Sequence, residues 1–282
     1  APLQSDEDNM TSIKTERILE NPKICIDHAG DGELLVLMHG IGGNRSNWTE
    51  QVEAFSPHFH TVAGDARGYG DSDDYAGPLD FEDFSRDLLG LLDHFGAEKA
   101  HLCGLSMGGR IAQDFYRMYP SRVKSLLLVA TFAGFKRLSE PERQRFVELR
   151  LKPLKEGGKE PKDIAPVVAR TLIGPNAPEV HYQRLVASME RLHKDSYIKT
   201  IESSTEHDKA LALETVTVPT QLIFGEHDSL TPPEIGRAMA ARIAGARFTE
   251  IADSGHLINI EQPAVFNRTA LDFLLAQGSD RG

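Results

Sequence analysis

The sequence predicts an α/β protein built on a doubly wound, mostly parallel sheet. Short apolar segments alternate with amphipathic helical patterns along most of the 282 residues, and this alternation is typical of parallel strands joined by crossover helices. Residues 123–129 are almost wholly apolar, as expected of a central strand covered on both faces. The composition, with 40% hydrophobic and 26% charged residues, is that of a globular protein with a sizeable core.

The individual elements follow from local patterns. Strands are predicted over 24–26, 34–38, 60–63, 100–103, 123–129, 220–224 and 247–251. Helices are predicted from Ser46 or Asn47 onward, over 79–95, 111–118, 233–243 and 263–275. Glycine-rich turns separate the first strands, and within the loop 64–72 we expect Asp65 and Arg67 to form a local polar contact.

The composition changes after Gly134. Residues 136–209 contain no convincing strand and several helical patterns, with 15 Lys/Arg against 12 Asp/Glu, whereas the whole chain has 31 against 42. A solvated helical insertion explains this balance, since charge runs are usually exposed faces. A mildly basic lid suited to an anionic substrate is the alternative that stays open.

Charge and cysteine usage exclude several classes of protein. A net charge of −11 without a basic tract argues against nucleic acid as a partner. No apolar run could cross a membrane, no signal peptide is recognisable, and Cys25 and Cys103 are expected to stay reduced, so we expect a cytoplasmic protein. The loop 64–72 lacks the ending of a phosphate-binding loop, and no His/Cys spacing indicates a metal, so no cofactor is expected. A homodimer is left open.

The run Gly104-Leu105-Ser106-Met107-Gly108 carries the strongest functional signal. It lies between a predicted strand and a predicted helix, where a serine is held in a strained turn with its hydroxyl exposed. The two flanking glycines remove side chains that would collide there. Ser106 is therefore the predicted nucleophile.

A serine hydroxyl needs a base and a group that orients the base. His256, in the loop between the last strand and the last helix, is the predicted base among 11 histidines. Asp228 follows the strand 220–224 and is the predicted orienting acid, with Asp253 as a rival of poorer geometry. The order serine, aspartate, histidine is that of a nucleophile-elbow hydrolase.

Acyl transfer also requires donors for the oxyanion. The N–H of Met107, directly after the nucleophile, is the first predicted donor. The loop after the strand 34–38 should supply the second, through Ile41 or, as second choice, Gly42. His39 in the same loop is expected to be structural.

Substrate contacts are less sharply indicated. Trp48 is a candidate to line the pocket, although it could equally staple the following helix. Arg143, Arg145 and Arg150 in the basic insertion are candidates to contact a substrate carboxylate.

These motifs together resemble those of the α/β-hydrolase superfamily over about residues 15–276. The resemblance rests on His39-Gly40, the run 65–72, Gly104-Leu105-Ser106-Met107-Gly108-Gly109, Gly225-Glu226-His227-Asp228 and Ser254-Gly255-His256. Gly-Leu-Ser-Met-Gly-Gly is similar to the 3-oxoadipate enol-lactonases and related small carboxylesterases. The resemblance implies an eight-stranded core sheet with its second strand antiparallel, a helical cap, and cofactor-free hydrolysis through an acyl-enzyme.

The expected organisation is one core interrupted by one cap. Its parts are a disordered or non-native leader (1–14), the first part of the core (15–132), the helical cap (133–209), the second part of the core (210–276) and a flexible tail (277–282).

The expected function is that of a serine hydrolase that cleaves a small carboxylic ester or (enol-)lactone with a Ser-His-Asp triad. Ser106 argues against epoxide hydrolases and haloalkane dehalogenases, which carry a similar loop but an aspartate nucleophile. A C–C bond hydrolase of meta-cleavage products (vinylogous 1,5-diketones) stays open, although Gly43-Asn44 departs from the His-Gly-x-Gly-Pro-Gly of those enzymes. A ligand receptor with slow turnover, and perhydrolysis as a side activity, also stay open.

Overall fold

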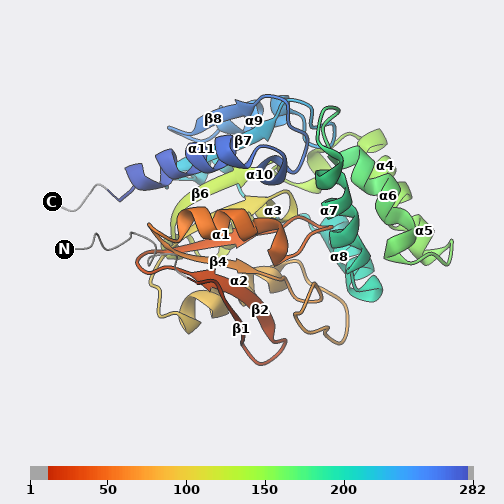
Figure 1. Ribbon diagram of the computed structural model, residues 1–282, viewed down its shortest axis with the longest axis horizontal. Helices are drawn as coiled ribbons and strands as arrows, with labels where there is room; N and C mark the ends of the chain where they lie inside the picture. The colour runs from red at the N-terminus through yellow and green to blue at the C-terminus, as the bar shows by residue number, and fades with distance from the viewer. Residues whose placement is uncertain (1–11, 279–282) are drawn as a thin grey trace, which may run out of the picture.

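The computed structural model describes residues 12–278, which contain one eight-stranded sheet (Figure 1). Its strand order is β1-β2-β4-β3-β5-β6-β7-β8. The strands are β1 (Lys14–Ile18), β2 (Ile24–Ala29), β3 (Leu34–Met38), β4 (His60–Gly64), β5 (Ala100–Leu105), β6 (Val123–Val129), β7 (Thr220–Gly225) and β8 (Arg247–Ile251). Neighbours from β4 to β8 in this order pair in parallel, whereas β2 is antiparallel to both β1 and β4. The predicted α/β fold, its eight strands and its antiparallel second strand are confirmed.

The seven strands predicted from their apolar patterns are all present. β1 was not predicted, because four of its five residues are exposed and its sequence Lys-Thr-Glu-Arg-Ile is largely polar. An edge strand can be polar in this way, and charged side chains there discourage pairing with another chain. Of the predicted leader 1–14 and tail 277–282, residues 1–11 and 279–282 lie outside the described part of the chain.

Helices cover both faces of the sheet and form two cores. On one face lie α2 (Glu82–His94), α3 (Met107–Met118) and α9 (Pro233–Ala240). On the other lie α1 (Thr49–Phe55) and α11 (Pro263–Ala276). Alternation along β3 serves both cores, since Val36 packs on the first face and Leu35 and Leu37 on the second. Such two-sided burial explains why the central strands have nearly continuous apolar sequences.

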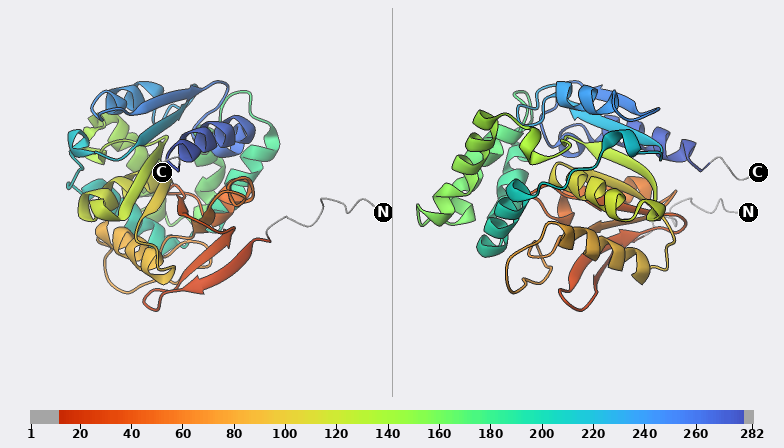
Figure 2. Two further views of the ribbon diagram at one scale, coloured as in Figure 1. Left: turned by 90° about the vertical axis from the view of Figure 1, so that its left-hand side faces the viewer. Right: turned by 180° about the vertical axis from the view of Figure 1, so that it is seen from behind.

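The segment between β6 and β7 contains helices and no strand. Its helices are α4 (Glu140–Arg150), α5 (Lys152–Lys155), α6 (Pro161–Leu172), α7 (Glu179–Glu190) and α8 (Lys194–Glu206). We call α4 to α8 the insertion. Figures 1 and 2 show these green and teal helices standing together beyond one end of the sheet. The boundaries 133–209 for a separate cap stay a prediction.

Two further features concern membrane-spanning helices and the cysteines. Within residues 12–278, every helix is too short or too polar to cross a membrane. Cys25 and Cys103 are both buried and free.

Candidate active site

Ser106 lies at the tight turn between β5 and α3. Its backbone has φ 55° and ψ −112°, a region that costs a non-glycine residue on the order of 1–3 kcal/mol. A Cβ at Gly104 would lie 2.1 Å from the Gly108 carbonyl oxygen, and one at Gly108 would lie 2.2 Å from the Met38 carbonyl oxygen. The turn therefore requires glycine at both positions, as the sequence predicted.

His256 and Asp228 meet across the loops that follow β8 and β7. Nδ1 of His256 lies 2.7 Å from Oδ2 of Asp228, and both residues are buried. With Nδ1 engaged by the carboxylate, Nε2 is the nitrogen that can accept a proton. Asp253, the rival acid, accepts a hydrogen bond from Asn176 Nδ2 at 2.8 Å instead.

Thr231 is a residue at the site that the sequence reasoning missed. Its hydroxyl donates to Oδ2 of Asp228 at 2.6 Å, and the N–H groups of Leu230 and Thr231 donate to Oδ1 at 2.9 and 3.0 Å. Three hydrogen bonds therefore hold the Asp228 carboxylate in addition to its contact with His256. The spacing Asp-Ser-Leu-Thr, in which an aspartate bonds the backbone two and three residues on, was the available signal.

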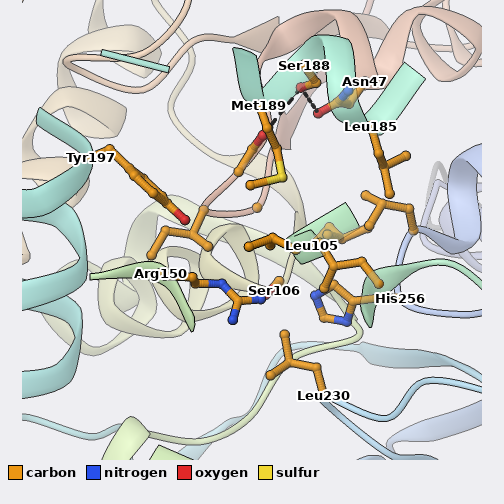
Figure 3. A pocket seen from close by; sticks show the side chains of 17 residues that line it. Asn47, Leu105, Ser106, Arg150, Leu185, Ser188, Met189, Tyr197, Leu230 and His256 are labelled. Carbon is orange, nitrogen blue, oxygen red and sulfur yellow. Dashed lines mark hydrogen bonds between the residues drawn. The ribbon is translucent and has the colours of Figure 1, made fainter. Parts of the chain in front are cut away.

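Ser106 and His256 line one cavity between the sheet and the insertion (Figure 3). The core also contributes the loop 40–43, while α6 and α7 contribute Leu172, Leu185 and Met189. Within the described residues the Ser106 hydroxyl makes no hydrogen bond. Catalytic hydrogen bonds in ligand-free enzymes are commonly long and tighten in the substrate complex.

The predicted oxyanion donors lie beside this cavity. Ile41 and Gly42 line it, and among the described residues the Ile41 N–H has no acceptor. Met107 is the first residue of α3, and the first N–H groups of a helix have no intrahelical partner. His39 accepts from the Ala66 N–H at 3.1 Å and its Nδ1 lies 2.7 Å from the Gly40 carbonyl oxygen, so the predicted structural role is confirmed.

Arg150 is the one predicted substrate contact that the structure brings to the cavity. Its side chain leaves the C-terminal end of α4, is 97% buried and points toward the side where Ser106 and His256 lie (Figure 3). Its Nε and the Tyr197 hydroxyl have no hydrogen-bond partner within residues 12–278, and no carboxylate there pairs with its charge. Burial lowers the pKa of Arg150, which the nearby Tyr197 partly opposes.

The other predicted contacts lie elsewhere. Arg143 is bound on the surface by Glu140 and by the carbonyl oxygens of residues 136 and 138, and Arg145 is exposed. Trp48 is buried against Phe266 of α11 and does not line the cavity.

The prediction of a polar contact between Asp65 and Arg67 is wrong. Arg67 binds both carboxylate oxygens of Asp87 on α2 at 2.7 Å, because its long side chain reaches out to that helix. Asp65 is buried under its own loop and pairs with Arg45. Among the described residues, Cys25, Asp65 and Asp71 come close enough together to hold a metal. Arg45 already neutralises both carboxylates, so the cluster is better explained as an ion-pair network.

The sequence pattern of the alpha/beta hydrolase family matches residues 35–269. The chain belongs to this family. 3-Oxoadipate enol-lactonase 2 of Acinetobacter baylyi is 27% identical over 241 residues, which cover 84% of this chain and 86% of that protein. The 2-hydroxy-6-oxononadienedioate/2-hydroxy-6-oxononatrienedioate hydrolase of Klebsiella pneumoniae is 28% identical over 266 residues, covering 89% and 91%. The structure of the enol-lactonase from Burkholderia xenovorans matches with a TM-score of 0.81 at 29% identity, covering 90% of this chain and 97% of that one.

These similarities confirm the predicted family, and with it an enzyme of the hydrolase class. For this alpha/beta hydrolase they do not choose among substrates, because the lactonase and the dienedioate hydrolase have nearly equal identity to it.

Proposed function

We propose that this alpha/beta hydrolase cleaves a small carboxylic ester or lactone through an acyl-enzyme formed on Ser106. The observation that carries the proposal is the 2.7 Å contact between Asp228 and His256 at the wall of the cavity that Ser106 also lines. The carboxylate holds the imidazole in one tautomer and stabilises its charged form. Ser106 then has a base beside it in the same buried space.

The chemistry would run in two balanced steps. His256 Nε2 takes the proton of Ser106 while Oγ bonds the substrate carbonyl carbon, and it returns that proton to the leaving oxygen as the ester bond breaks. Water next gives a proton to His256 and attacks the acyl-enzyme, and Ser106 regains its proton as the acid leaves. The N–H groups of Ile41 and Met107, with Gly42 as the second choice, would stabilise the oxyanion in both steps, each by roughly 3–4 kcal/mol.

The proposed substrate carries a carboxylate that Arg150 binds. A buried guanidinium without a countercharge is unfavourable in the free protein, and an anionic substrate would supply both the charge and hydrogen-bond acceptors. Tyr197, whose hydroxyl is also unpartnered, offers a further donor. Arg143 and Arg145 take no part in this proposal.

A C–C bond hydrolase of meta-cleavage products is the second candidate. The similarity to the Klebsiella pneumoniae dienedioate hydrolase favours it. The oxyanion loop counts against it, because Gly43 replaces the expected proline and Asn44, which caps the 3₁₀ helix at Arg45–Trp48, replaces the expected final glycine. Steady-state assays of an enol-lactone beside a ring-fission dienoate would separate the two, and faster loss of the dienoate would favour the second candidate.

The deciding experiment is Ser106→Ala, assayed with p-nitrophenyl acetate and a fluorophosphonate label. We expect both turnover and labelling to be lost. Ser188→Ala is the matched control, because Ser188 also lines the cavity, and it should still be labelled. Labelling that persists in Ser106→Ala would refute the nucleophile. A wild-type kcat far below the ~1 s⁻¹ typical of slow enzymes, with tight product retention, would instead favour a ligand receptor.

A further inference from the structure

Glu261 is a buried carboxylate that the proposed chemistry does not use. It ends the short helix α10 (Ile258–Glu261) and is 6% exposed. Its Oε1 accepts the Gly174 N–H at 2.8 Å and the Gly255 N–H at 3.1 Å, and its Oε2 lies 3.0 Å from the same Gly255 nitrogen. No lysine or arginine pairs with it within residues 12–278.

The contacts of Glu261 fit its ionised form. Both partners are N–H donors, and a protonated carboxyl would in addition need an acceptor for its own hydrogen. Burial raises the pKa of Glu261, while the two N–H groups and the nearby His256 act in the opposite direction and Asp228 adds to the rise. A buried charge of this kind destabilises the fold unless hydrogen bonds compensate. The compensation here comes from two peptide groups that belong to different parts of the molecule.

Those two peptide groups join the insertion to the loop of the proposed base. Gly174 lies in the connection between α6 and α7, and Gly255 directly precedes His256. The two backbones touch, since a Cβ at Gly255 would lie 2.6 Å from the Gly174 nitrogen. The N–H of His256 itself donates to the Leu172 carbonyl oxygen at 2.8 Å. The backbone that carries the imidazole is therefore bonded directly to the last residue of α6, Leu172, and through Glu261 to Gly174 in the connection that follows this helix.

From this geometry we infer that Glu261 is a positioning residue that makes the placement of His256 depend on the docking of the insertion. The inference rests on the proposed function, because it takes His256 as the base. Glu261 touches neither the cavity nor Ser106, and it acts through the peptide N–H next to the base. When α6 and α7 are docked, one carboxylate holds Gly174 and Gly255 together. When they are not, the histidine loop loses both its bond to Leu172 and its link to Gly174.

Two variants test this from opposite ends of the link. Glu261→Gln keeps the shape but places an NH₂ group where one oxygen now accepts from Gly255. Gly174→Ala leaves Glu261 intact but inserts a methyl group 2.8 Å from its Oε1. Glu226→Gln is the matched control, because Glu226 also accepts a backbone N–H of this loop, that of Asp253 at 2.9 Å, but is exposed and does not reach the insertion.

The readouts are kcat and KM for p-nitrophenyl acetate and the rate of fluorophosphonate labelling at Ser106. In both test variants we expect kcat and the labelling rate to fall together by ~10-fold or more, as misplacement of a catalytic group does, with KM within about 3-fold. Glu226→Gln should match the wild type, and circular dichroism should show native folds.

Three outcomes would overturn the inference. They are a normal kcat in folded Glu261→Gln or Gly174→Ala, a loss confined to KM, or an equal loss in Glu226→Gln. If Glu261→Gln does not fold, Gly174→Ala decides alone. Failure of the proposed function would look different, because wild-type protein would then not be labelled at Ser106 at all.

Discussion

The candidate site has two halves that are built in different ways. The core half consists of loops at the ends of β3, β5, β7 and β8, where Ser106, Asp228 and His256 are fixed by backbone geometry and short hydrogen bonds. The insertion half consists of side chains from α4 to α8, among them Tyr197 and the neighbouring Arg150, whose Nε has no hydrogen-bond partner within the described residues. The Asp228 carboxylate and the His256 imidazole of the first half are paired without a substrate, whereas no carboxylate within residues 12–278 pairs with the buried charge of Arg150 in the second.

This difference indicates that the two halves have different roles, one in the reaction rate and the other in substrate preference. Groups that are already held in place can act on any carbonyl that enters, because their geometry does not depend on the substrate. Groups that are desolvated and unpaired gain most from a ligand that pairs with them. Core variants should therefore lower the rate for all substrates alike, and variants of the insertion side chains that line the cavity should change the preference among substrates.

The largest effect is expected from Asp228→Asn. The amide keeps the size of the side chain but cannot hold His256 in the tautomer whose Nε2 accepts a proton, so kcat should fall by roughly 10⁴-fold. The measurement is kcat for two p-nitrophenyl esters, the acetate and the hemisuccinate, which differ by a carboxylate.

Because Asp228 belongs to the core half, its loss should not distinguish between the two esters. The two esters should lose rate by the same factor, because Asp228 is not expected to contact either acyl group. A loss more than about 10-fold larger for one ester would mean that Asp228 also takes part in substrate recognition. Asp253→Asn, which alters an acid that does not contact His256, should leave both rates near wild type.

The next effect is expected from Arg150→Met. Removing the guanidinium should lower kcat/KM for the hemisuccinate by about 10- to 100-fold, the worth of a charge-assisted hydrogen bond, and leave the acetate within about 2-fold. Methionine is chosen because replacing a buried unpaired charge by an apolar side chain of similar length is often neutral or stabilising. Unfolding temperatures should therefore not fall.

Arg145→Met is the matched control for Arg150→Met. Arg145 lies on the same helix but is exposed, so its loss changes the net charge by the same amount without changing the cavity. Equal behaviour of the two variants toward the hemisuccinate would assign the effect to long-range charge and would remove Arg150 from the site.

The core half could be predicted from the sequence because its signals are local. The glycines around Ser106 and the strand before it report one tight turn, and the position of His256 and Asp228 after their own strands places them at the same edge of the sheet. The central strands were equally readable from their apolar runs. β1 was not, because an exposed edge strand carries little hydrophobic pattern.

The insertion half could not be predicted to the same degree. Arg143 and Arg150 are seven residues apart and fall on similar faces of one helix, yet only Arg150 lies in the cavity. Packing of α4 on its neighbours decides this, and no local pattern encodes that packing. Glu261 was missed for the same reason, since its partner Gly174 is 87 residues away. For Arg67 the sequence pattern indicated its neighbour Asp65, whereas its partner is Asp87 on α2, which lies across the loop.

The smallest effect is expected from Ser188→Ala, which tests where the division between the two halves runs. Ser188 belongs to α7, but its hydroxyl accepts from Asn44 Nδ2 at 3.1 Å and lies 3.4 Å from the Gly42 carbonyl oxygen in the predicted oxyanion loop. Losing neutral hydrogen bonds of this kind costs about 0.5–1.5 kcal/mol, or roughly 2- to 10-fold in rate. If kcat falls equally for the acetate and the hemisuccinate, α7 supports the chemistry as well as the pocket, and the boundary lies within the insertion. If the two esters respond differently, the insertion acts on selectivity alone, and the contact with Asn44 does not steady the oxyanion loop.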